Sequence, residues 1–127
     1  MKKINQARHK QNLGKYGESL AASFLGKKGY HIIEQNFKAR YGEIDIIAKK
    51  GETLVFIEVK TRIGKRFGTP QESITPKKIR ELIKTAEYYC LLHPHLPKQL
   101  RIDVVALKLT PEKSVETMEH IQNVTGY

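Results

Sequence analysis

The sequence is poor in cysteine, tryptophan and long apolar runs. Cys90 is the single cysteine, and there is no tryptophan. One cysteine excludes an intrachain disulfide, and its place among apolar residues predicts a buried, reduced thiol. No segment reaches the roughly 20 apolar residues of a membrane span. A polar run follows Lys2 and Lys3 where a signal peptide would need an apolar stretch. We therefore expect a cytoplasmic protein with no membrane partner.

Acidic residues are also few relative to basic ones. The chain has 23 Lys and Arg against 13 Asp and Glu, and its formal net charge is +10. This excess favours polyanionic partners, nucleic acid first, through counterion release and electrostatic steering. Structural RNA-binding proteins share the same balance, so charge alone does not identify an enzyme.

The length of 127 residues fits one domain with one compact core. Residues 1–10 are polar and basic without periodicity, which predicts a flexible N-terminal arm. Such an arm could touch phosphate backbones or serve only as a solubilising end. Residues 11–127 are expected to form the single domain.

The apolar pattern predicts an α/β fold in the order α, β, β, β, α, β. The first helix covers residues 12–28, and the second is capped by Thr75, starts at Pro76 and ends by residue 94. The predicted strands, which together form a central mixed sheet, cover residues 30–38, 43–48, 53–62 and 100–109, with a weaker edge strand near 117–124. Alternation places Ile44, Ile46 and Ala48 on one face of the second strand. The third strand is apolar on both faces at its start, so it should be central and covered.

Charged side chains interrupt these apolar elements at particular points. Glu58 and Lys60 are two residues apart on a strand, so they share a face with Cα atoms about 7 Å apart. The preceding hairpin can set Asp45 beside them. Glu18 lies at the border of the apolar stripe of the first helix, which is an unusual place for a carboxylate. Two carboxylates with waters suit Mg²⁺, and a nearby ammonium can hold the attacking water or a phosphate.

Two segments carry a family pattern: Gly42-Glu43-Ile44-Asp45-Ile46-Ile47-Ala48 and Phe56-Ile57-Glu58-Val59-Lys60-Thr61-Arg62. They resemble the PD-(D/E)xK nuclease superfamily and, more closely, the small bacterial YraN-like proteins. The likeness covers most of the chain, because it extends to Gly14-Lys15-Tyr16-Gly17-Glu18-x-x-Ala21, Phe67-Gly68 and Arg101-Ile102-Asp103-Val104-Val105.

The resemblance implies a restriction endonuclease-like core related to archaeal-type Holliday-junction resolvases. It also implies the roles of four catalytic residues. Asp45 and Glu58 would bind one or two Mg²⁺ or Mn²⁺ ions, together with the Val59 backbone carbonyl. Lys60 would be the catalytic amine, and Glu18 would bind the metal directly or through water. The sequence departs from the superfamily pattern at Ile44, which stands where proline usually precedes the aspartate.

A basic loop follows the third strand. Lys65, Arg66 and Phe67 could grip a phosphate backbone and stack on a base, and Arg62 precedes them on the strand. Gln71 lies near where this superfamily often adds a polar residue to the site. A glycine-rich basic surface loop needs no function, however, and that reading is equally open.

Two further candidates have ordinary structural readings. His93 and His95 flank Pro94 after the second helix, and this arrangement is typical of a turn rather than a transition-metal site. Asp103 lies in an apolar strand, where a structural ion pair with an arginine or lysine is favoured over a site role.

The functional expectation is a Mg²⁺-dependent endonuclease that hydrolyses phosphodiesters of DNA, with branched or structured DNA as one candidate substrate. One alternative is a catalytically silent nucleic-acid-binding module that keeps a nuclease fold. Another is an RNA-processing nuclease, because nothing in the chain indicates a reader of the 2′-hydroxyl. The junction-cutting relatives are dimers, which suggests a homodimer here.

Overall fold

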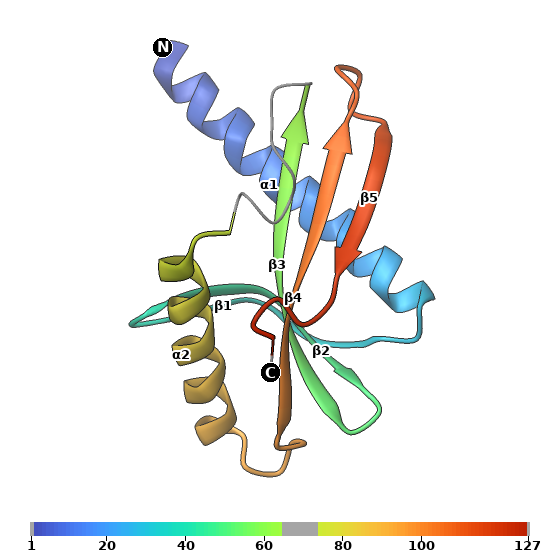
Figure 1. The fold of residues 1–127 in the computed structure, drawn as a ribbon. Coiled ribbons are helices and arrows are strands. Elements are labelled where there is room, and N and C mark those ends of the chain that lie inside the picture. The colour runs from blue at the N-terminus through green and yellow to red at the C-terminus, as the bar shows by residue number, and fades with distance from the viewer. Residues whose placement is uncertain (1, 65–73, 127) are drawn as a thin grey trace.

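A computed structural model describes the backbone of residues 2–64 and 74–126 and the side chains of 12–64 and 74–126 (Figure 1). The predicted order of helices and strands is confirmed, including the edge strand. The elements are α1 (Lys2–Lys27), β1 (His31–Ala39), β2 (Gly42–Lys50), β3 (Thr53–Ile63), α2 (Pro76–Leu92), β4 (Gln99–Leu109) and β5 (Val115–Ile121).

The first helix is longer than the apolar spacing predicts. Its backbone is helical from Lys2, so α1 extends through the segment that we expected to form an arm. Apolar periodicity did not reveal these turns, because residues 1–10 are mostly polar and basic. The flexibility of this segment stays a prediction.

Within the described ranges the strands form one five-stranded mixed sheet, ordered β1-β2-β3-β4-β5. The pairs β1–β2, β2–β3 and β4–β5 are antiparallel, whereas β3 and β4 are parallel. The parallel pair requires a crossover, and α2 lies in that connection. The predicted central place of β3 is therefore confirmed.

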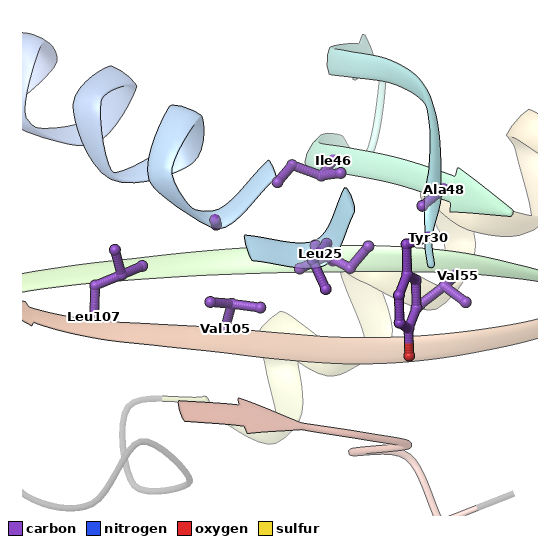
Figure 2. Close-up of a cluster of buried hydrophobic side chains, with 9 residues drawn as sticks. Leu25, Tyr30, Ile46, Ala48, Val55, Val105 and Leu107 are labelled. Carbon is purple, nitrogen blue, oxygen red and sulfur yellow. The ribbon is translucent and has the colours of Figure 1, made fainter. Parts of the chain in front are cut away.

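Each face of the sheet is covered by one helix. On β3, Val55 and Ile57 join a core with α1, whereas Leu54 and Phe56 join a core with α2. This alternation matches the prediction. Figure 2 shows the α1 side, where Leu25 lies among the sheet residues. Both layers hold the middle of β3 rigidly, which gives any charged side chain that follows a fixed position.

The alternation predicted for β2 is wrong at Ile44. Ile44 packs in the α2-side core, whereas Ile46 and Ala48 pack in the α1-side core. Asn36 lies between the neighbouring β1–β2 pairs Gln35–Ile46 and Phe37–Ile44, and its φ is 57°, in the left-handed region. The change of face thus coincides with this irregular backbone on β1 and with the end of the β2–β3 pairing, both at the level of Asp45.

The second helix begins as predicted. Thr75 caps it by accepting a hydrogen bond from the Lys78 N–H, and Pro76 occupies the first turn. Cys90 is half-buried rather than buried, and burial raises the pKa of its thiol. Among the residues that the structure describes, no helix is long and apolar enough to cross a membrane.

Candidate metal-binding site

Asp45 lies where β2 and β3 separate. The β2–β3 pairing runs from Lys50–Thr53 to Ile46–Ile57 and ends there. Beyond it the Asp45 side chain takes over the contact, because its Oδ2 accepts a hydrogen bond of 2.8 Å from the Val59 N–H. The carboxylate is 9% exposed. The strand pair thus holds a buried acid at a fixed point between two strands.

Glu58 lies next to this point on β3 and is 7% exposed. Each of its oxygens faces one ammonium group. Lys60 Nζ lies 3.5 Å from Oε1, as expected for residues that share a strand face, and Lys78 Nζ lies 3.8 Å from Oε2. The side chains of Glu58 and Lys60 are therefore brought together as the sequence predicts.

Lys78 is a site residue that sequence reasoning missed. The Thr75–Pro76 cap does place it in the first turn of α2. Its approach to Glu58 depends on how α2 packs across the sheet, and no local pattern encodes that packing. The nearest signal in the sequence is a lysine in the first turn of a helix, where the dipole does not favour a cation.

Glu18 approaches the site from α1. Its neighbour Gly17 packs so closely on β3 that a Cβ at this position would overlap Thr61 Oγ1. The close approach lowers Glu18 towards the sheet, where one of its oxygens, Oε1, is buried with no hydrogen-bond partner among the described residues. Burial raises the pKa of Glu18, Glu43 and Glu58 raise it further, and a hydrogen bond from Asn36 acts in the opposite direction.

The carboxylates repel one another. Burial raises the pKa of Asp45 to about 7, and the negative charges of Glu58, Glu18 and Glu43 raise it as well, against the Val59 hydrogen bond. A bound cation would relieve this repulsion, and oxygen donors of this type suit a hard divalent ion. Across the described ranges, no group of three or more His, Cys, Asp or Glu side chains is arranged so that it could hold a metal ion. Mg²⁺ usually binds one or two carboxylates and keeps several waters, so the donor set fits it.

The remaining predicted site residues divide into two groups. Arg62 continues the Glu58–Lys60 face of β3 and is half-buried. The N–H of Val59 serves Asp45, while the metal contact of its carbonyl stays a prediction. The basic loop residues and the polar residue before α2 lie outside the described residues: Lys65, Arg66, Phe67 and Gln71.

The two alternative candidates have structural roles, as predicted. His93 caps α2 and stacks on Tyr89 at 4.0 Å between ring centroids. Asp103 is fully buried and accepts two hydrogen bonds from Arg101, of 2.9 and 2.8 Å. The Asn123 N–H and His120 complete its surroundings, and the hydrogen bonds lower its pKa although burial opposes them.

Fold and site together define a small mixed α/β domain in which, over the described residues, two helices pack on a five-stranded sheet and a buried carboxylate pair lies at a strand separation. Residues 17–107 match the family described as "Uncharacterised protein family UPF0102". The chain belongs to this family, which confirms the resemblance to YraN-like proteins. The matched region includes the three carboxylates at the strand separation and both lysines at Glu58.

Relatives of similar length share much of the sequence. A UPF0102 protein of Syntrophomonas wolfei is 45% identical over 89% of this chain and 96% of its own. One of Caldanaerobacter subterraneus is 42% identical over 97% of this chain and 98% of its own. One of Clostridium perfringens is 44% identical over 90% of this chain and 89% of its own. These alignments span most of both chains, so the likeness is one of whole domains.

Proposed function

We propose that this protein is a metal-dependent endonuclease that hydrolyses DNA phosphodiesters at the Asp45–Glu58 site. One observation carries the proposal: two nearly inaccessible carboxylates meet where β2 and β3 separate, and among the described residues no lysine or arginine forms an ion pair with Asp45 that would compensate its charge. Burying like charges together is costly unless a cation joins them. Structural stability alone gives no reason to keep such a pair.

The surroundings of the pair support phosphodiester chemistry. Asp45 and Glu58 would hold a Mg²⁺ or Mn²⁺ ion, with Glu18 as a further ligand directly or through water. Such an ion supplies a more acidic bound water and neutralises charge on the phosphate. Lys60 places an ammonium beside the same carboxylate, where it can donate to a phosphate oxygen or to the attacking water.

The reaction would be an in-line displacement at phosphorus. The attacking water forms a new P–O bond and loses a proton, while the bond to the leaving sugar oxygen breaks and that oxygen gains a proton. The net charge of +10 would attract the DNA substrate through its phosphates. The mixed sheet and the buried carboxylates also support our proposal that the domain has a restriction endonuclease-like core of the PD-(D/E)xK superfamily. We further propose that the protein is cytoplasmic and acts as a homodimer.

The test uses purified protein with Mg²⁺ or Mn²⁺ and four substrates: duplex DNA, single-stranded DNA, a four-way junction and a matched RNA. We expect cleavage of at least one DNA substrate, lost in chelator and lost in Asp45→Asn and Lys60→Ala. Glu43→Gln removes a neighbouring exposed carboxylate and is the matched control, which should keep its activity.

Other outcomes would point elsewhere. Cleavage that survives both substitutions would rule out the assigned site. Cleavage restricted to RNA would replace the DNA substrate with an RNA-processing function. Salt-sensitive binding without cleavage under any metal, unchanged by Asp45→Asn, would instead identify a silent binding module.

A further inference from the structure

We propose that Lys78 alternates between Glu58 and a substrate phosphate: it neutralises Glu58 without metal and donates to the phosphodiester once a metal ion is bound. This inference rests on the proposed function. It adds a second ammonium to the site, from α2 rather than from the strand that carries Lys60.

Glu58 is paired with two ammonium groups. One ammonium faces each carboxylate oxygen, at 3.5 Å for Lys60 and 3.8 Å for Lys78. These distances exceed the roughly 2.7–2.9 Å of a direct charge-assisted hydrogen bond. Both contacts are therefore loose ion pairs, which a stronger cation can displace without breaking a close hydrogen bond.

Lys78 has a fixed backbone and a partly exposed side chain. Its backbone is fixed, because the Lys78 N–H donates to the Thr75 cap at 3.1 Å. Its side chain is 31% exposed, against 9% for that of Glu58. The Lys78 side chain thus contacts both a buried carboxylate and solvent, so a phosphodiester that enters from solvent could reach its ammonium.

A bound divalent ion would compete with Lys78 for the Glu58 carboxylate. A divalent ion bound to Glu58 must share oxygens that two ammonium groups now face. It would reduce the attraction that holds Lys78 there, and the released ammonium stays tethered within a side-chain length of the site. A phosphate bound to the metal then offers the nearest negative charge, so Lys78 becomes a substrate contact.

The experiment compares Lys78→Ala with Lys77→Ala, which removes the same charge from the same turn of α2 at an exposed position. Mn²⁺ affinity is measured by electron paramagnetic resonance without DNA, and cleavage rate is measured with the best DNA substrate. We expect Lys78→Ala to bind Mn²⁺ about 3- to 10-fold more tightly, since a competing cation is gone. Its cleavage rate should fall about 10- to 100-fold.

The opposite signs are the signature of the exchange, and Lys77→Ala should show neither change beyond a small loss of DNA attraction. Lys78→Arg keeps the charge and should recover most of the cleavage rate. Equal weakening of Mn²⁺ binding and cleavage in Lys78→Ala would indicate a merely structural role and overturn the inference. Values equal to those of Lys77→Ala would overturn it too. Absence of Mn²⁺ binding in the wild type would instead remove the proposed function itself.

Discussion

Asp45 and Asp103 are both acids in the middle of a sheet, yet their surroundings differ completely. Asp103 is fully buried and receives hydrogen bonds from Arg101 and the Asn123 backbone, with His120 at 2.8 Å. Asp45 is 9% exposed and, within the part of the chain that the structure describes, receives one hydrogen bond, from Val59, while three glutamates repel it. Its pKa is raised and that of Asp103 is lowered.

The comparison separates a structural acid from a candidate ligand. Burial by itself does not distinguish them, because both are almost inaccessible. The distinction lies in compensation: Asp103 has the partners that a buried charge needs, whereas no cationic side chain among the described residues pairs with Asp45, and we propose that a bound cation does. The predictions below test this difference, beginning with the largest expected effect.

Activity should depend on Asp45 and not on a neighbouring surface acid. Asp45→Asn removes the charge that would bind the metal ion, so metal-dependent cleavage should fall by about 1000-fold or more. The measurement is the initial rate at saturating Mn²⁺ against Glu43→Gln, which should stay within a few-fold of the wild type. A fully active Asp45→Asn protein would contradict the comparison.

The free energy of unfolding should fall on substitution of Asp103 and not on substitution of Asp45. Asp103→Asn leaves Arg101 and His120 without their carboxylate, and we expect a loss of about 3 kcal/mol in the free energy of unfolding. Asp45→Asn removes a repelled charge, so unfolding free energy should stay equal or rise. Chemical denaturation at neutral pH without metal measures both. Equal destabilisation by the two substitutions would remove the distinction.

Acid should also act in opposite directions on the two carboxylates. The folded-state pKa of Asp45 is raised from 3.8 to about 7. The folded protein therefore holds the Asp45 proton more tightly than the unfolded chain does. The contribution of Asp45 to the free energy of unfolding falls by roughly 2–4 kcal/mol as pH rises from about 4 to 7. The pKa of Asp103 is lowered, so its contribution is present above pH 3.8 and is lost as pH falls through the folded pKa.

Unfolding free energy measured between pH 4 and 8 checks this sign. As pH rises, Asp45→Asn should become increasingly more stable than the wild type in its free energy of unfolding. Addition of Mn²⁺ at neutral pH should make the wild type the more stable of the two. A difference that does not change with pH would contradict the raised pKa of Asp45.

The smallest expected effects concern how α1 reaches the site. Gly17→Ala would place a Cβ against Thr61, so α1 must shift, at a cost of about 1–3 kcal/mol. The shift would move Glu18 and should lower Mn²⁺ affinity. Gly14→Ala has free space on the same helix and should stabilise by about 0.5–1 kcal/mol without changing the metal affinity. Thermal unfolding and Mn²⁺ titration of the two variants test the close approach.

Much of the fold could be predicted because local rules and burial agree. Leu54 to Ile57 alternate between two apolar cores, and the Thr75–Pro76 cap fixes where α2 begins. Ile44 could not be placed correctly, because strict alternation assumes a regular strand pair, whereas the β2–β3 pairing ends at Ile46 and Asn36 on β1 has left-handed backbone. The predicted start of α1 was wrong because a mostly polar helical segment carries no apolar period.

The site could be predicted only in part. Glu58 and Lys60 follow from the two-residue period of β3, and the hairpin brings Asp45 near them. Two features required the three-dimensional structure. They are the separation of β2 from β3, where Asp45 accepts a hydrogen bond from the Val59 N–H, and the packing that sets Lys78 against Glu58. Sequence period describes a single element, whereas these contacts join residues from different elements.

The most direct test of the central claim is Mn²⁺ binding to the wild-type protein, Asp45→Asn and Glu43→Gln, measured by electron paramagnetic resonance at neutral pH without nucleic acid. If the buried pair is a cation site, the wild type and Glu43→Gln bind Mn²⁺ with similar affinity, and Asp45→Asn loses most of it. No binding by the wild type, or equal binding by all three, would contradict the account.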